Sequence, residues 1–78
     1  MGLAKDELAG ALDGQGCLGK ASPDEPVFIL RAQDFLSDKR VDDWANEAEE
    51  HGYSIAKLSE VRDLAAQMRK WPNRKYPD

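Results

Sequence analysis

The 78-residue chain has few of the residues that metal and disulfide sites require. It contains one cysteine, Cys17, and one histidine, His51. A single cysteine excludes an intrachain disulfide and is typical of a reducing compartment. His51 lacks the neighbouring Cys, His or carboxylate spacing of a metal site, and its place at the expected end of a helix favours capping. We therefore expect no metal and no other cofactor.

Long hydrophobic runs are also missing. The longest, at residues 27–30, has four residues, whereas a membrane span needs about 18. Charged residues from Lys5 to Asp13 interrupt the first 16 positions, which argues against a signal peptide. The sequence predicts a cytoplasmic protein without a membrane segment.

The net charge of −4 argues against general binding of polyanions. Its distribution is uneven. Residues 1–30 carry −3, residues 31–50 carry −4 and residues 51–78 carry +3. The C-terminal third is thus basic within an acidic protein, an asymmetry that head-to-tail copies would exploit.

Two helices are predicted in the second half of the chain. The first spans 38–51, with Ser37 as N-cap, Gly52 as left-handed C-cap residue, and an apolar stripe of Val41, Trp44, Ala45 and Ala48. The second spans 55–71, begins after Ser54 and stops before Pro72. Its stripe comprises Leu58, Val61, Leu64, Ala65, Met68 and Trp71. The short connection predicts an antiparallel helical hairpin in a mainly α protein.

The first half is less regular. Residues 1–24 are expected to be flexible or ordered only by contact, because a helix over residues 3–12 falls below the roughly 12 residues that an isolated helix needs. Residues 25–78 form the single small domain. Within it, residues 27–30 fit a short buried strand or a helix start. We favour the extended form, which needs a partner strand that a dimer would supply. The hairpin also offers little core for its length, so we expect a homo-oligomer.

Three motifs have weaker interpretations. Gly14, Gly16 and Gly19 spell G-x-G-x-x-G, but the residues before them favour helix and those after them cannot start one, so a glycine linker is preferred to a phosphate loop. The adjacent carboxylates of residues 42–43 and 49–50 fall on a solvated helix face, and Cys17 has no histidine motif beside it, so we expect no enzyme activity. The apolar spacing around Gly52 also approximates a DNA-binding helix-turn-helix, although Glu60 and Asp63 would face the phosphates.

Residues 69–76, R-K-W-P-N-R-K-Y, form a basic stretch with two aromatic residues and are the main candidate site. Cations there would hold phosphate while Trp71 or Tyr76 stacks on a base; alternatively, the cations cap a helix and Trp71 seals the core. The candidate residues for an anion, a nucleotide or a partner are Lys20, Arg31, Arg69, Lys70, Trp71, Arg74, Lys75 and Tyr76.

Residues 16–78 carry a recurrent pattern: G-C-L-G-K-A, then D-E-P-V-F-I-L-R-A-Q-D, then W-A, then M-x-x-W-P-x-x-K-Y-P-D. In this order the chain resembles short proteins encoded by bacteriophages and prophages. The resemblance implies a non-enzymatic accessory or counter-defence protein in the host cytoplasm, which blocks a host protein or sequesters an anionic nucleotide. The alternatives are a small DNA-binding transcriptional regulator and a purely structural assembly factor.

Overall fold

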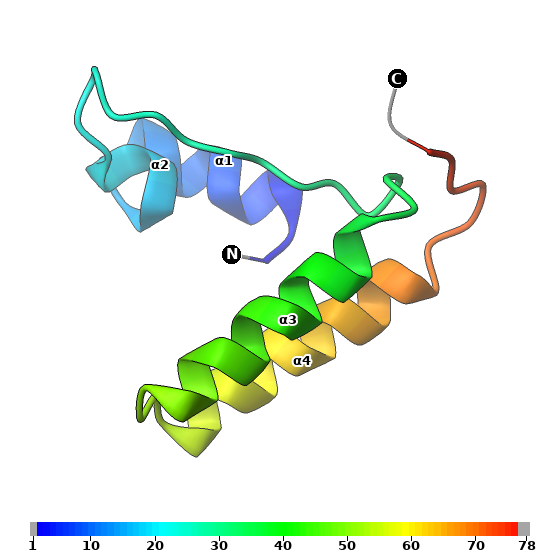
Figure 1. The fold of residues 1–78 in the computed structure, drawn as a ribbon. Coiled ribbons are helices and arrows are strands. Elements are labelled where there is room, and N and C mark those ends of the chain that lie inside the picture. The colour runs from blue at the N-terminus through cyan, green and yellow to red at the C-terminus, as the bar shows by residue number, and fades with distance from the viewer. Residues whose placement is uncertain (1, 77–78) are drawn as a thin grey trace.

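The computed structural model describes residues 2–76 as a mainly α protein (Figure 1). Its helices are α1 (Ala4–Leu12), α2 (Gly16–Lys20), α3 (Ser37–Glu50) and α4 (Ile55–Arg69). Helices α3 and α4 pack as a hairpin, as the sequence predicts. The described residues contain no sheet; their one β-type pairing is an isolated parallel bridge between Asp34 and Lys75.

The turn between α3 and α4 is closed by a helix cap that the sequence encodes. Gly52 has a φ of +83°, in the left-handed region. The Gly52 amide donates to the Glu49 carbonyl at 3.1 Å, and the Tyr53 amide donates to the Ala48 carbonyl at 3.2 Å, the pair of bonds that defines a Schellman motif. Ser54 then caps α4 by accepting a hydrogen bond from the Lys57 amide at 3.2 Å. Both predicted caps of this turn are confirmed.

The hydrophobic core lies between α3 and α4. Ala45 and Ala48 of α3 are small, which allows Leu58 and Val61 of α4 to pack close to its backbone. Ala65 and Met68 extend the buried face of α4. Two members of the predicted stripes lie elsewhere: Trp44 is half exposed beside Tyr53, and Trp71 is 56% exposed.

The ends of these helices correct two predictions. Ser37 is not an N-cap; it is the first residue of α3, it is buried, and its hydroxyl donates to the Asp34 carbonyl at 2.8 Å. Helix α4 ends at Arg69 instead of residue 71. Trp71 therefore lies outside the helix and does not seal the core, so that part of the alternative is wrong, whereas cations do end the helix, with Arg69 in its last turn and Lys70 as its C-cap residue.

The N-terminal segment contains the helix predicted over residues 3–12, observed as α1, followed by the shorter α2 packed against it. Gly14 and Gly16 have φ values of +71° and +73°. A Cβ on Gly19 would lie 2.6 Å from the carbonyl carbon of Gly14. Because Gly16 and Gly19 belong to α2, the glycine-rich stretch is not a linker; it allows two short helices to approach closely. The mobility of residues 1–24 stays a prediction.

A long connection without helix or strand joins α2 to α3 (Figure 1). Residues 27–30 lie within it, outside any helix, as expected. They are not buried as a strand in a core would be: Val27 and Ile29 are exposed, and Phe28 is 86% exposed. Within a single chain the expectation of burial is therefore wrong, since among residues 2–76 no second strand covers the segment. Burial against a second copy stays a prediction.

Candidate functional site

The C-terminal residues fold back onto the start of α3. The Lys75 amide donates to the Gln33 carbonyl at 2.9 Å, and the Phe35 amide donates to the Lys75 carbonyl at 2.7 Å. Asn73 allows this return because it adopts a left-handed φ of 58°, a conformation that asparagine tolerates better than most residues. The predicted basic stretch is thus held beside the connection that precedes α3, some forty residues earlier in the chain.

Arg74 fixes this arrangement. Its side chain is only 9% exposed, and it donates to the carbonyls of Ala32 and Asp34 at 3.0 and 2.9 Å. It also forms an ion pair with Asp38 at 2.7 Å and lies over the ring of Phe35, 5.1 Å from its centroid. A planar guanidinium can bond several acceptors at once. Arg74 therefore ties the C-terminal segment to α3.

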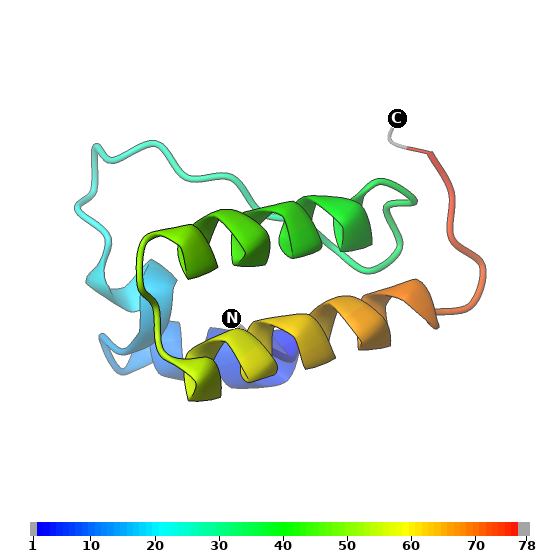
Figure 2. The same cartoon turned by 60° about the horizontal axis from the view of Figure 1, so that its bottom comes forward.

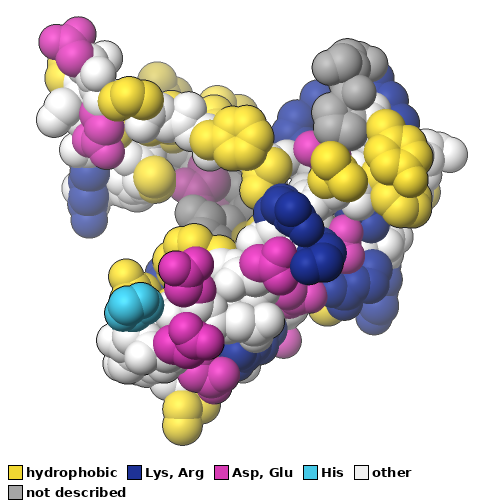
Figure 3. Space-filling view, viewed as in Figure 1, with side chains coloured by type: hydrophobic (Ala, Val, Ile, Leu, Met, Phe, Trp, Pro, Cys, Tyr) yellow, Lys and Arg dark blue, Asp and Glu magenta, His cyan; other side chains and the backbone are white. Residues whose placement is uncertain are grey.

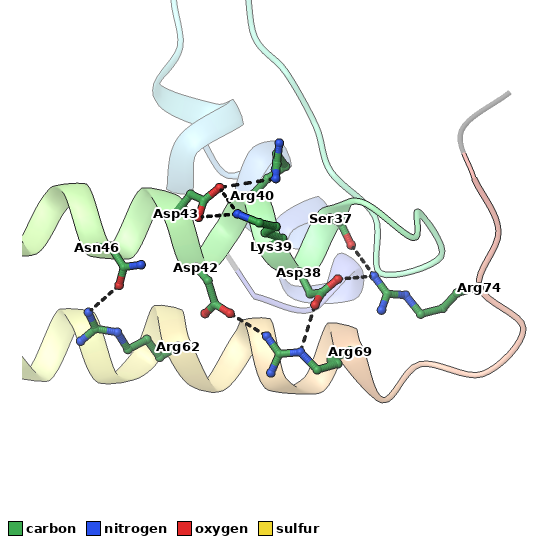
Figure 4. A network of polar contacts seen from close by, with 10 residues as sticks. All are labelled: Ser37, Asp38, Lys39, Arg40, Asp42, Asp43, Asn46, Arg62, Arg69 and Arg74. Carbon is green, nitrogen blue, oxygen red and sulfur yellow. Dashed lines mark hydrogen bonds and ion pairs between the residues drawn. The ribbon is translucent and has the colours of Figure 1, made fainter.

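Arg69 completes the network from the last turn of α4. It donates to Asp38 at 3.0 Å and to Asp42 at 2.6 Å (Figure 4). The hydrogen bond from Arg74 is the main cause that lowers the pKa of the Asp38 carboxyl, and Arg69 lowers it further. In turn, the bonds to Asp38 and Asp42 raise the pKa of the Arg69 guanidinium. We call Arg69, Arg74, Asp38 and Asp42 the arginine clasp.

The arginine clasp leaves fewer cations of the basic stretch available to a ligand. Two of its cations face two carboxylates of α3, so their charges are largely neutralised within the molecule. An incoming phosphate would have to displace Asp38 from Arg74, which is shielded from solvent. A role for Arg69 and Arg74 in ligand binding stays a prediction, whereas their structural contacts are observed.

The remaining predicted residues are divided between two places. Lys20 is the last residue of α2, on the opposite side of the molecule from the C-terminal segment in both ribbon views (Figures 1 and 2). Arg31 donates to the Gln33 side chain at 2.8 Å, close to the bridge with Lys75. Lys20 therefore does not join the C-terminal candidates, while Arg31 lies near them.

Exposed aromatic and aliphatic side chains remain at this end of the molecule. The rings of Phe35 and Tyr76 lie 5.2 Å apart at an interplanar angle of 31°. Leu36 and Trp71 are also about half exposed, and Lys70 caps α4. In the space-filling view, hydrophobic and basic side chains adjoin on this side (Figure 3). We define Phe35, Leu36, Lys70, Trp71 and Tyr76 as the end patch.

Sequence reasoning did not identify Phe35 and Leu36. The available signal was an apolar pair immediately before a helix start, where such residues often pack against the first turn. Their place beside the C-terminal residues, however, depends on the return of that segment, which has no local signal.

Two shallow grooves lie away from the end patch. One, of about 340 Å³, lies between the start of α1 and α4 and is lined by Leu3, Leu64, Asp6, Glu60 and Asp63, together with Gly2 and Gln67. The other, of about 260 Å³, adjoins the hairpin turn and is lined by Glu49, Ile55, Leu58, Ser59, Arg62 and Asp63. Carboxylates line both, so neither favours the phosphates of a nucleotide.

Residues 2–76 include no group of three or more His, Cys, Asp or Glu side chains able to hold a metal ion. None of the helices in this range is long and apolar enough to cross a membrane. No protein-family model, curated protein or solved structure gives a significant match to the chain. The resemblance to phage-encoded proteins accordingly stays a prediction.

Proposed function

We propose that this protein is a small, non-enzymatic binding protein whose end patch docks on a partner protein. The observation that carries the proposal is the imbalance between exposed and buried apolar side chains. Fourteen large hydrophobic residues are exposed, whereas the buried core has six hydrophobic members, three of them alanine. Isolated exposed apolar residues are ordinary, whereas neighbouring ones are typical of interaction sites, and in the end patch the rings of Phe35 and Tyr76 lie against each other while both stay at least half exposed.

The end patch has the composition of an interface centre. Aromatic residues are enriched in interfaces and supply much of their binding energy. Here three aromatics and one leucine accompany an exposed lysine. The partner surface that suits this set is apolar at its centre with carboxylates at its rim, because Lys70 takes part in no ion pair among residues 2–76.

Nucleotide sequestration is the weaker form of the proposal. It would rely on four cations, Arg69, Lys70, Arg74 and Lys75, and the two arginines already hold α3 carboxylates. The phage resemblance supports a host protein as partner, which would make the chain an accessory or counter-defence protein.

DNA binding is also less favoured. Helices α3 and α4 run alongside one another (Figure 2), whereas a helix-turn-helix crosses its helices at about 90–120°. The exposed side of α4 carries Glu60 and Asp63, and DNA phosphates would repel both.

The test compares capture of bacterial host proteins by three versions of the chain. The patch variant carries Trp71→Ala and Tyr76→Ala, and the control carries Ile55→Ala, which removes an 87% exposed side chain at the start of α4. Circular dichroism first confirms that all three versions are equally helical. We expect one defined protein to be retained by the wild type and the control and reduced at least tenfold with the patch variant. Equal retention by all three versions, or no specific protein at all, would contradict the proposal.

Calorimetric titration of linear and cyclic nucleotides distinguishes nucleotide sequestration from docking on a host protein. Heat that disappears on Lys70→Ala with Lys75→Ala, while host-protein capture is unaffected by the patch variant, would replace the protein-docking proposal with sequestration.

A further inference from the structure

The connection between α2 and α3 contains a segment with unused bonding capacity. Among residues 2–76, no hydrogen bond reaches the backbone of residues 26–30. Val27, Phe28 and Ile29 in the same segment are exposed. β-branched and aromatic residues favour strands, and an unpaired strand is a template for another strand. The segment therefore has both the backbone groups and the side chains of a strand without a partner.

We propose that residues 25–31 pair with the same residues of a second copy, as antiparallel strands related by a two-fold axis at Phe28. A two-fold axis through an antiparallel pair places one residue opposite its own copy. With Phe28 at the axis, Val27 lies opposite Ile29 of the second copy, and Pro26 lies opposite Leu30. Glu25 then lies opposite Arg31 at both ends of the ribbon.

Charge complementarity selects a second copy as the occupant. The segment is acidic at its start and basic at its end, with apolar residues between them. An antiparallel copy thus presents Arg31 to Glu25 and Glu25 to Arg31, and opposite charges across a strand pair are stabilising. Neither Glu25 nor Arg31 has an ion-pair partner within residues 2–76; their side chains bond only to the Ser22 amide and the Gln33 side chain. In the backbone, the Glu25 amide donates to the Ser22 carbonyl and the Arg31 carbonyl accepts from the Asp34 amide, two local bonds that pairing of the outermost residues would exchange.

Pro26 is compatible with this register and indicates its phase. Proline has no amide hydrogen, so it must occupy a position outside the ladder of hydrogen bonds. Positions alternate along antiparallel strands, so Pro26 and Phe28 share the non-hydrogen-bonded phase. The two copies of Phe28 then face each other at the closer of the two spacings, where an aromatic pair adds to the stability.

Sedimentation equilibrium of the full chain tests the pairing with two charge reversals. Because a two-stranded ribbon is marginal in water, we expect a wild-type dimer in the micromolar range. Arg31→Glu and Glu25→Lys should each raise its dissociation constant at least tenfold. An equimolar mixture of these two variants should recover dimerisation as a heterodimer, because one chain is then acidic and the other basic at both paired positions.

Asp24→Lys is the matched control, since it makes the same charge change one residue away, on the other face of the strand and opposite Ala32. We expect its dissociation constant to stay within about twofold of the wild type. A chain that is monomeric at several hundred micromolar, a mixture that does not associate, or equal effects at Asp24 and Glu25 would overturn the proposal.

Disulfide trapping tests the register itself, in a Cys17→Ser background. Phe28→Cys places two thiols opposite each other at a Cα separation of about 4.5 Å, within the range that a disulfide spans. Ile29→Cys, at a position that is also exposed, places them more than about 7 Å apart, beyond the reach of a disulfide. Rapid cross-linking is expected for Phe28→Cys alone. Equal rates at the two positions would contradict the register even if the chain is dimeric.

Discussion

The two helix pairs of this protein are held together in different ways. In the N-terminal pair, none of the residues of α1 or α2 is buried. In the C-terminal pair, α3 and α4 enclose the hydrophobic core, and the arginine clasp joins their far ends. Both pairs are short helices connected by glycine-containing turns, so the difference lies in packing. A helical sequence pattern thus gives a stable helix only where its apolar face packs against the apolar face of another element.

Close backbone approach replaces side-chain burial in the N-terminal pair. Gly19 lets α2 contact the turn at Gly14, while Leu8 and Leu12 of α1 remain exposed. The N-terminal pair is therefore expected to open at lower free energy than the hairpin, as regions with few buried contacts do.

The largest effect should come from the core. Leu58→Ala should lower the free energy of unfolding by about 3 kcal/mol, through lost burial and a residual cavity. The same change in α1, Leu8→Ala, should stay within about 0.5 kcal/mol, because Leu8 is exposed. Urea unfolding followed by circular dichroism measures both, and similar losses at the two positions would break the contrast between the helix pairs.

Arg74→Met should cause the second-largest loss in the free energy of unfolding. It removes hydrogen bonds to two carbonyls and one carboxylate, for which we expect a loss of about 2 kcal/mol, given that charged hydrogen bonds contribute roughly 1.5–3 kcal/mol. Arg69→Met should have a smaller effect on the urea midpoint, since Arg69 is half exposed. The reverse order would show that the clasp depends on Arg69.

Gly19→Ala tests whether the N-terminal helix pair can be destabilised without an effect on the hairpin. A methyl group there collides with the Gly14 backbone, and overpacking of this kind costs at least about 1 kcal/mol. Gly10→Ala is the control, because its new Cβ would meet only an ordinary contact at 3.5 Å. Amide hydrogen exchange should show faster exchange in α1 and α2 for Gly19→Ala alone, with α3 and α4 unchanged. Faster exchange throughout α4 would contradict the independence of the two pairs.

The smallest effect concerns pH and is confined to the hairpin. Arg74 lowers the pKa of Asp38 below its ordinary value of 3.8. The contribution of ionised Asp38 is therefore complete above the unfolded-state value and is lost as the pH falls through the lower folded-state value. Urea midpoints of wild type and Asp38→Asn, measured from neutral pH into this acid range, should converge as the pH falls. A constant difference would show that the ionisation of Asp38 is not linked to folding.

The sequence predicted the hairpin because its signals are local. The alanine and leucine spacing, the Gly52 turn and the Ser54 cap each act within a few residues. The boundaries at Ser37 and Trp71 were predicted wrongly for different reasons. Ser37 makes a different local bond, to the Asp34 carbonyl three residues earlier, whereas beyond α4 a tertiary contact overrides local preference, because the segment turns back to pair with Gln33.

The candidate site shows the same division. The basic stretch was visible in the sequence, but the partners of Arg69 and Arg74 were not, since they lie 27 to 42 residues away. Charge counted along the chain gives the C-terminal third a positive excess, while folding brings two α3 carboxylates against it.

By itself, the sequence determined the helices of the hairpin, where the hairpin turns and which residues can serve as its core, because periodicity and capping depend on neighbouring residues. Only the tertiary structure decided which cations are engaged by carboxylates and which apolar residues stay exposed. Those outcomes depend on contacts between segments distant in the chain, which no local pattern specifies.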